Sequence, residues 1–422
     1  MENTNHKSSK ALKWHPPRHT PPTAVPIQLR DLWGGISAFR HSDYALDNFT
    51  MKVANYLGIK TCFLVSSGRA ALTLILIAAK HSSNRAEVII PAYGCPTVTQ
   101  SILAADLTPI YCDVSTKTLD LDREDLLNHL TDNTLAIIPT HLYGLAQDIS
   151  DLLEIGQSQE IYIIEDTAQS FGASVKNNYV GTFGDAGFFS LGRGKCLPTG
   201  HGGMIVAQGI LKNRMEDILQ EFLEPISSYD IKSLISYTAY GAAILPLFWW
   251  FIVRSNFNPA NDGMKFEVLP DITIQGFSKT QAGIGSSILN RYKEINKIRR
   301  QNALRMMSQI LEIGSVRLPE IHLNANPVFL RLPIICNNQH QADNVFNLLN
   351  QCGIGVSKSY THTIPDVFSK YLEIPRNNYP GASFLAKCLL TLPTHQYVRE
   401  NDFTNIKEAL ASFDKKGINI CQ

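Results

Sequence analysis

The stretch from Gly181 to Gly203 reads GTFGDAGFFSLGRGKCLPTGHGG and holds an apolar run, a glycine-rich bend and a single lysine, Lys195. Similar apolar runs precede it, each separated from the next by a helix-like segment: EVIIP at 87–91, TPIYC at 108–112, LAIIP at 135–139 and IYIIED at 161–166. Short continuous apolar runs joined by helices are typical of strands that are buried on both faces. We therefore predict an α/β fold with a mostly parallel sheet flanked by helices, followed by a smaller α+β C-terminal domain.

Composition changes along the chain predict its division into parts. Residues 1–26 are polar and proline-rich, without the apolar core of a secretory signal. A charge-rich helical pattern begins at Ser278 and is expected to form one long helix to about residue 313. We predict a flexible arm at 1–30, a large domain at 31–277, a bridging helix at 278–314 and a small domain at 315–422.

Composition also excludes several classes of protein. The chain has 422 residues, of which 44% are hydrophobic and 18% charged, so it is not a disordered chain. Its formal net charge of +1 excludes a dedicated nucleic-acid binder, which carries a strong basic excess. The eight cysteines are scattered, with no CxxC pair and no zinc-ligand spacing. They predict reduced thiols, a cytoplasmic protein and no metal site.

The stretch from Leu234 to Val253 (LISYTAYGAAILPLFWWFIV) carries no charge and is flanked by Lys232 and Arg254. Its length suits a bilayer span, but Pro246 and several hydroxyls interrupt it. The sequence leaves three alternatives open: a buried or interfacial helix, a membrane-docked or re-entrant hairpin, and a true span. The adjacent tryptophans at 249 and 250 are typical of an interface anchor.

The lysine in the glycine-rich bend does not belong to a phosphate-binding P-loop. That motif requires Ser or Thr after Gly-Lys, and here Cys196 follows Lys195; its first glycine is replaced by Phe189. A partly desolvated lysine can instead form an imine with a carbonyl, most commonly that of pyridoxal 5′-phosphate (PLP).

PLP needs a carboxylate for its ring nitrogen, anion-binding groups for its phosphate and a flat side chain against its ring. Candidates for each lie where predicted strands end, the edge at which α/β sheets bind ligands. These candidates are Asp166 for the nitrogen, Gln169 nearby, Gly68, Arg69 and Ser190 for the phosphate, and Tyr93 for the ring.

At this point the chain resembles the DegT/DnrJ/StrS family of PLP-dependent sugar aminotransferases, of aspartate-aminotransferase fold type I. The resemblance covers roughly residues 45 to 415 in the family's order. It rests on VSSGRAAL at 65–72, VIIPAYGCPTV at 88–98, PIYCDV at 109–114, PTHLYG at 139–144, IIEDTAQSFGA at 163–173, GTFGDAGFFSLGRGK at 181–195, TGHGGMIV at 199–206, TQAGIG at 280–285 and LLTLPTHQYV at 389–398.

The resemblance implies a role for each candidate. Lys195 is the Schiff-base lysine and moves the proton, Asp166 pairs with the ring nitrogen, and Gln169 supports the phenolic oxygen. Gly68, Arg69 and Ser190 hold the phosphate, and Tyr93 stacks on the ring. Family members are homodimers whose sites are completed by an Asn of the partner subunit. In this chain that position is Ser278.

The expected function is therefore transfer of an amino group from an amino acid, glutamate by expectation, to a keto-sugar. A nucleotide-linked sugar in glycan or secondary-metabolite biosynthesis is the expected acceptor. Two departures bear on the acceptor: Gly200-His201-Gly202-Gly203 replaces GEGG, and Ser359-Tyr360-Thr361 replaces an HYP-like element. With the apolar stretch at 234–253, they suggest an atypical acceptor handled near a membrane.

Two alternatives differ from this function. A sugar dehydratase of the same fold replaces the imine lysine with histidine, so Lys195 argues against it. A non-catalytic, ligand-sensing or membrane-tethered relative predicts loss of cofactor residues, which this chain keeps. Among the remaining polar residues, Asp185 is expected to brace a loop and His201 to be structural, and for His141 both a site role and a structural role stay open.

Overall fold

The structure is a computed structural model that describes residues 18–41, 44–222, 229–255, 272, 274–373 and 378–414. Its centre is a seven-stranded sheet in the order β1-β9-β8-β5-β4-β2-β3. The strands are β1 (Phe63–Val65), β2 (Glu87–Pro91), β3 (Thr108–Cys112), β4 (Thr134–Ile137), β5 (Tyr162–Asp166), β8 (Ala186–Ser190) and β9 (Gly203–Ala207). Pairing is parallel from β3 through β2, β4 and β5 to β8, and antiparallel from β8 to β9 and β1. The predicted α/β fold with a mostly parallel sheet is confirmed.

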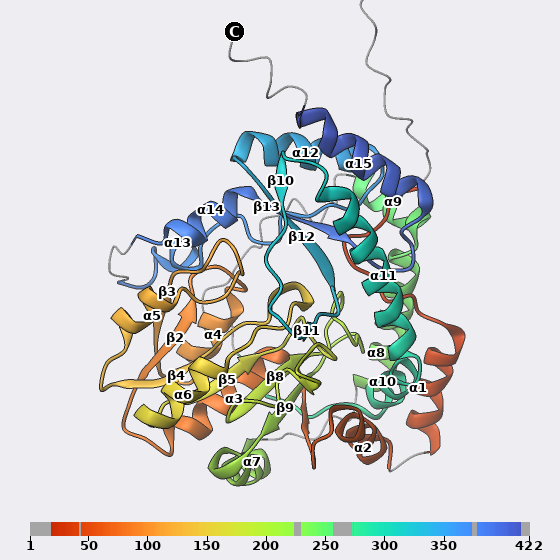
Figure 1. The fold of residues 1–422 in the computed structure, drawn as a ribbon. Helices are drawn as coiled ribbons and strands as arrows, with labels where there is room; N and C mark the ends of the chain where they lie inside the picture. The colour runs from red at the N-terminus through yellow and green to blue at the C-terminus, as the bar shows by residue number, and fades with distance from the viewer. Residues whose placement is uncertain are drawn as a thin grey trace, which may run out of the picture.

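Helices cover both faces of this sheet (Figure 1). They include α3 (Gly68–Lys80), α4 (Thr97–Ala104), α5 (Arg123–His129), α6 (Ser150–Gln159) and α7 (Gly209–Phe222), with a short 3-10 turn, η1 (Leu142–Gly144). Helix α3 begins at Gly68 because the Ser67 hydroxyl accepts a hydrogen bond from the backbone N–H of Ala70 at 3.1 Å. Its alanine- and leucine-rich sequence is almost entirely buried, so the helix lies inside the core and holds its N-terminus fixed.

The C-terminal part is built on a second sheet, in the order β10-β12-β13 with antiparallel pairing. Its elements are β10 (Val316–Arg317), β12 (Arg331–Cys336), α12 (Gln339–Gln351), α13 (Ile364–Phe368), α14 (Pro380–Cys388), β13 (Leu389–Pro393) and α15 (Glu400–Asp414). A third sheet of short strands joins β11 (Ala325–Asn326) to β6 (Ser174–Val175) and β7 (Asn178–Tyr179). The C-terminal part therefore adds a strand beside the large domain's own loops.

The single helix expected from Ser278 is two helices, α10 (Lys279–Leu289) and α11 (Tyr292–Ile310). Arg291, at the break, has non-helical backbone angles. Its guanidinium donates to the Asp31 carboxylate at 2.6 Å and to the carbonyl of Pro26 at 2.8 Å. This buried ion pair fastens the break to α1 (Leu29–His41), which packs on α10 beside α2 (Ala45–Leu57). Helix α11 then runs up one side toward the small sheet (Figure 1).

The arm predicted as flexible at 1–30 lies partly outside the described residues, which begin at Arg18. The described part is packed, contrary to the expectation. Arg18 forms an ion pair with Asp402 at 2.8 Å, and the backbone of Thr20 donates to the carbonyl of Gly353 at 2.9 Å. The buried His395 ring hydrogen-bonds the carbonyl of Pro21 at 2.8 Å. The prolines disfavour helix and strand in this segment, but its extended backbone still packs against the C-terminal part of the chain.

The uncharged stretch at 234–253 forms two helices, α8 (Tyr229–Ala243) and α9 (Pro246–Arg254). They meet at 86°, because Pro246 begins the second helix and cannot continue the first. Among the described residues no single helix has the length and apolar composition to cross a bilayer, whereas this bent pair passes that test when its two helices are taken together. Side chains of α9 are only partly covered, and Phe248 and Phe251 are 49% and 55% exposed.

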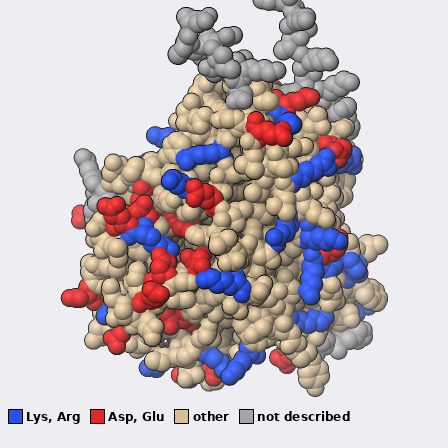
Figure 2. All heavy atoms as spheres, viewed as in Figure 1, with Lys and Arg blue, Asp and Glu red and all other residues tan. Residues whose placement is uncertain are grey.

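Although the net charge is near zero, the charged side chains are unevenly distributed over the surface. Acidic side chains gather on the face over α5 and α6, and basic side chains gather on the side that carries α11 (Figure 2). In α5 the acidic residues Glu124 and Asp125 lie in the first turn, where they complement the helix dipole. The charges thus balance over the molecule without forming a continuous basic surface on the face shown.

Candidate active site

A cavity of about 250 Å³ lies at the carboxyl ends of β5 and β8, against the N-terminus of α3. Six of the predicted site residues line it: Gly68, Arg69, Asp166, Gln169, Ser190 and Lys195. Their positions span more than a hundred residues of sequence, from Gly68 to Lys195, and they converge because parallel strands end at one edge of the sheet.

Asp166 ends β5 with only 5% of its surface exposed. One carboxylate oxygen accepts the backbone N–H of Ala168 at 3.0 Å, and the other has no hydrogen-bond partner among the described residues. Burial raises the pKa of this carboxyl above its usual value, an effect that the Ala168 N–H and the nearby Lys195 partly oppose. A cationic nitrogen beside the free oxygen would stabilise the ionised form.

Lys195 lies in the bend between β8 and β9, and its side chain lines the same cavity. Its backbone N–H donates to the carbonyl of Gly192 at 3.2 Å, which closes a tight turn. Gly194, just before it, has a positive φ of 73°, a conformation that glycine adopts without strain. Within the described part of the chain the Lys195 amine has neither a hydrogen bond nor an ion pair. It is therefore available to a ligand.

The N-terminus of α3 forms a cradle with Ser190. A Cβ atom added at Gly68 would stand 3.1 Å from Cβ of Ser190, a tight contact, so glycine eases the close approach of the two segments. The backbone N–H groups of a first helical turn lack intrahelical partners and carry partial positive charge. The Ser190 hydroxyl has no partner among the described residues. The cradle thus presents several donors to one anion.

Gln169 connects the cavity to the C-terminal part of the chain. Its amide oxygen accepts the backbone N–H of Tyr143 at 3.3 Å, and its amide nitrogen donates to the hydroxyl of Tyr360 at 2.9 Å. Tyr360 belongs to the element Ser359-Tyr360-Thr361. Tyr360, which belongs to an element that departs from the family pattern, therefore contacts a residue that lines the predicted cofactor site.

Tyr93 differs from its prediction, because it does not line the cavity. Its hydroxyl lies 3.1 Å from that of Tyr143, and its ring packs edge-on against Tyr360 with centroids 5.7 Å apart. Cys95, two residues later, reaches the cavity instead. Tyr93 therefore forms a cluster with Tyr143 and Tyr360 beside the cavity rather than inside it.

Ser278 also lies away from the cavity of its own chain. It is buried and caps α10: its hydroxyl accepts the backbone N–H of Gln281 at 3.2 Å, and the Gln281 side chain accepts the Ser278 N–H at 3.1 Å. The predicted contact from a partner subunit is not tested by a single chain and stays a prediction.

His141, for which both roles were open, is a bracing residue. The ring is fully buried, and its Nδ1 accepts the backbone N–H of Gln147 at 3.1 Å. The proton therefore lies on Nε2, which donates to Glu165 at 3.0 Å. Glu165 also accepts the N–H groups of Gly181 and Phe183, each at 2.7 Å. Asp185, as predicted, braces a loop by accepting the N–H of Ile163 at 2.8 Å.

Sequence reasoning missed Tyr143 and Arg331. Tyr143 is fully buried with a left-handed φ of 57°, a strained conformation that is common beside functional sites. Arg331, on β12, donates to the Ser359 hydroxyl at 2.9 Å and has no carboxylate within ion-pair distance among the described residues. Desolvation lowers the pKa of this guanidinium, and nearby tyrosines including Tyr143 oppose that shift. Arg331 lies in the apolar run 327–336, and no local sequence pattern there indicated a residue near the site.

Comparisons with known proteins agree with this geometry. The model of the DegT/DnrJ/EryC1/StrS aminotransferase family matches residues 38–221 and 276–411. The chain is 35% identical over 161 residues, 38% of its length and 44% of the relative, to the GDP-perosamine synthase of Escherichia coli O157:H7. It is 34% identical over 187 residues, 44% of each chain, to the L-glutamine:2-deoxy-scyllo-inosose aminotransferase of Streptomyces kanamyceticus. These matches therefore span less than half the length of either relative.

The fold is similar to that of the sugar aminotransferase CalS13 from Micromonospora echinospora, with a TM-score of 0.74. That match has 21% sequence identity and covers 93% of this chain and 99% of the other. The family model covers most of the chain on both sides of a gap at 222–275. The sheet, the cavity at its edge and the matching sequence together place this chain in the DegT/DnrJ/EryC1/StrS aminotransferase family.

Proposed function

We propose that this chain is a PLP-dependent aminotransferase that moves an amino group from an amino acid, glutamate in the first instance, to a nucleotide-linked keto-sugar. The observation that carries the proposal is one cavity that holds both the unpaired amine of Lys195 and the unpaired oxygen of buried Asp166. An amine and an acid in one enclosed site suit imine chemistry and proton transfer.

The residues present fit PLP at each polar position. Asp166 offers a buried oxygen for a cationic ring nitrogen, the start of α3 with Ser190 offers donors for a phosphate, and Lys195 offers an amine for the aldehyde. When bound, PLP supplies an electron sink that stabilises negative charge on the carbon bearing the amino group.

The chain's own residues then hold the reactants and move the proton. With PLP bound, the Lys195 amine would take the proton from the donor's α-carbon as general base and later release it as general acid. Asp166 would hold the ring nitrogen in its cationic form, and Gln169 is fixed by hydrogen bonds with Tyr143 and Tyr360. In the second half-reaction the same amine returns a proton to the acceptor's carbon.

A sugar acceptor is supported by the names of the relatives, which include a GDP-perosamine synthase and an aminotransferase acting on a deoxy-inosose. A dehydratase of the same fold is disfavoured because Lys195 stands at the imine position. The purified protein with PLP and L-glutamate should release about one equivalent of 2-oxoglutarate per site, and then aminate one member of a panel of nucleotide-linked keto-sugars. Mass spectrometry measures both products, and L-glutamine replaces glutamate in a parallel reaction.

Absence of keto acid with either donor, despite bound PLP, would contradict the proposal and favour a non-catalytic relative. Release of water from the sugar in place of amination would favour the dehydratase. Each outcome is distinguished by the mass of the sugar product.

We also propose a homodimer in which Ser278 of the partner subunit approaches the cavity, as the family position implies. The family position alone supports this proposal, since Ser278 is buried and caps α10 in the single chain. Light scattering measures the mass in solution.

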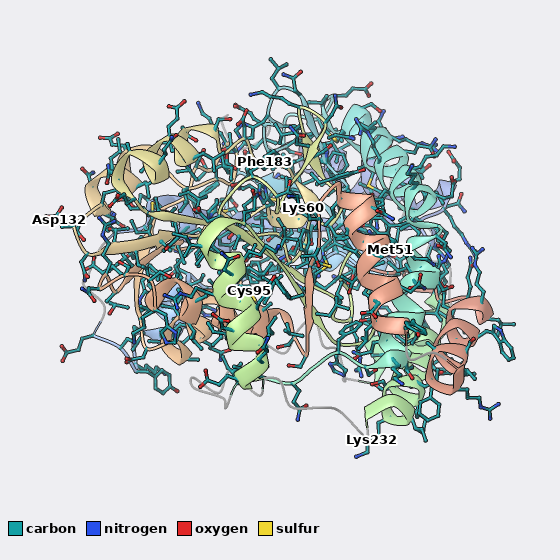
Figure 3. The ribbon with its side chains drawn as sticks, turned by 90° about the horizontal axis from the view of Figure 1, so that it is seen from below. Met51, Lys60, Cys95, Asp132, Phe183 and Lys232 are labelled. Atoms are coloured by element: carbon teal, nitrogen blue, oxygen red, sulfur yellow. The ribbon has the colours of Figure 1, made fainter. Side chains whose placement is uncertain are left out.

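We further propose that the cytoplasmic protein contacts a membrane surface through α8 and α9. Ile235 on α8 is 64% exposed, and Phe248 and Phe251 on α9 are about half exposed. The Arg254 guanidinium lies 4.9 Å from the ring centroid of Trp250, an arrangement suited to the headgroup region. Lys232, at the start of α8, projects outward at the rim of the molecule (Figure 3). An apolar face edged by cations suits the boundary of an anionic bilayer.

The double variant Phe248→Ser with Phe251→Ser should lose binding to vesicles of phosphatidylcholine and phosphatidylglycerol, measured by flotation, because it removes apolar surface from the docking face. The control Leu323→Ser changes a residue that is 85% exposed elsewhere. If the unaltered protein ignores the vesicles and stays monodisperse without detergent, the proposal is wrong. If the double variant instead halves the mass in solution, the face is an interface between copies of the chain.

A further inference from the structure

Helix α8 lies against the bend that carries Lys195, on the side of the helix opposite its exposed face. Three of its residues, Ser236, Tyr237 and Tyr240, touch this bend. They are spaced at i, i+1 and i+4, which places them on one side of the helix. Ile231 and Ile235 are exposed, at 61% and 64%.

The hydrogen bonds between α8 and the bend fall on residues both before and after Lys195 in the sequence. The backbone N–H of Gly194 donates to the Tyr240 hydroxyl at 3.0 Å, and the guanidinium of Arg193 donates to the Ser236 hydroxyl. Beyond the lysine, the hydroxyl of fully buried Tyr237 donates to the carbonyl of Pro198 at 3.3 Å. The helix therefore fixes backbone groups on both sides of the reactive side chain.

The Tyr240 hydroxyl accepts the N–H of Gly194, which has no acceptor within the bend itself. The bend closes through Leu191 to Gly202 and Lys195 to Gly192, and neither bond uses the N–H of Gly194. A partly buried N–H is destabilising without an acceptor, so the hydrogen bond to this hydroxyl restrains the bend. Burial raises the pKa of Tyr240, which keeps its hydroxyl neutral.

This restraint does not belong to the part of the chain that the family model covers. The match ends at residue 221 and resumes at 276, so α8 lies wholly in the unmatched segment, whereas Lys195 lies within the match. A helix that the family model does not cover therefore contacts the bend that carries Lys195, a residue that the model does cover. Tyr240 is also close enough to Arg331 to interact with it electrostatically.

We propose that Tyr240 is a positioning residue for Lys195: its hydroxyl anchors Gly194 and thereby holds the lysine's amine in the place from which it transfers protons. This inference rests on the proposed function, because it assigns α8 a part in the same site. Proton transfer requires close alignment, and small displacements of a reacting group reduce rate more than they reduce substrate binding.

The test is Tyr240→Phe, which removes one hydroxyl and keeps the ring. The donor half-reaction should slow about tenfold while the donor's KM stays within about twofold, since the altered contact acts on alignment rather than on binding. Independently of activity, backbone amides at 192–200 should exchange hydrogen faster, as measured by mass spectrometry of the PLP-bound protein. Tyr237→Phe removes the second anchor and should raise exchange at the far end of the bend.

Tyr371→Phe is the matched control, because Tyr371 is exposed on the C-terminal part and should change neither measurement. Thermal unfolding separates a loss of alignment from a loss of fold. If Tyr240→Phe leaves both the exchange at 192–200 and the half-reaction unchanged, the inference is overturned. If the unaltered protein shows no half-reaction, the proposed function fails. In that case faster exchange in the variant still supports the anchor, and unchanged exchange overturns it.

Discussion

The Lys195→Ala protein should retain bound cofactor but lose the donor half-reaction by about 10³-fold or more, because it removes the amine that carries the proton. The start of α3, Ser190 and Asp166 remain, so the cavity keeps its other polar contacts. Stopped-flow absorbance of the PLP-bound variant mixed with donor measures the rate, and mass spectrometry of the unaltered protein after borohydride reduction shows whether PLP is attached at Lys195.

Two controls sharpen this result. Lys176→Ala removes an exposed lysine that pairs with Asp148 away from the cavity, and it should leave the rate unchanged. Adding methylamine to Lys195→Ala should restore part of the rate, because a small free amine can occupy the vacated space and accept the proton. A half-reaction that proceeds at full speed in Lys195→Ala would contradict the assignment of this lysine.

Replacement of Asp166 by Asn should slow the half-reaction by about 10²–10³-fold, the cost of removing a preorganised charge from an enclosed site. The change keeps the side chain's size and its capacity to accept the Ala168 N–H. The amide cannot hold a ring nitrogen in its cationic form, so charge on the reacting carbon is less well stabilised. Rates for Asp166→Asn and Asp166→Glu, with thermal unfolding as a fold check, measure this effect.

Asp185→Asn provides the matched control for Asp166. Asp185 is also a carboxyl whose pKa is raised by burial, and it also accepts a backbone N–H, from Ile163. It lies before β8 rather than at the cavity, so its replacement should change stability with little change in rate per folded molecule. Equal losses of rate in the two variants would show that burial, rather than contact with the ring nitrogen, explains the effect.

The strands of the large sheet could be predicted because they are local features of the sequence. The runs at 87–91 and 108–112 form β2 and β3 with the predicted bounds, since short continuous apolar runs between helices are typical of strands buried on both faces. The helix expected from Ser278 is interrupted at Arg291, where the ion pair with Asp31 ties the break to α1, and these two residues lie far apart in sequence. No local pattern could indicate that pair.

The sequence alone determined the parallel sheet, the cradle at Gly68, and the placing of Asp166 and Lys195 at one sheet edge. Strand ends and glycine-rich turns are set by neighbouring residues, so they can be recognised without the fold. Only the tertiary structure decided that Tyr93 joins a tyrosine cluster, that Arg331 stands behind it, and that Tyr240 anchors Gly194. These contacts join side chains from distant segments, and they depend on the path of the chain through space rather than on any local periodicity.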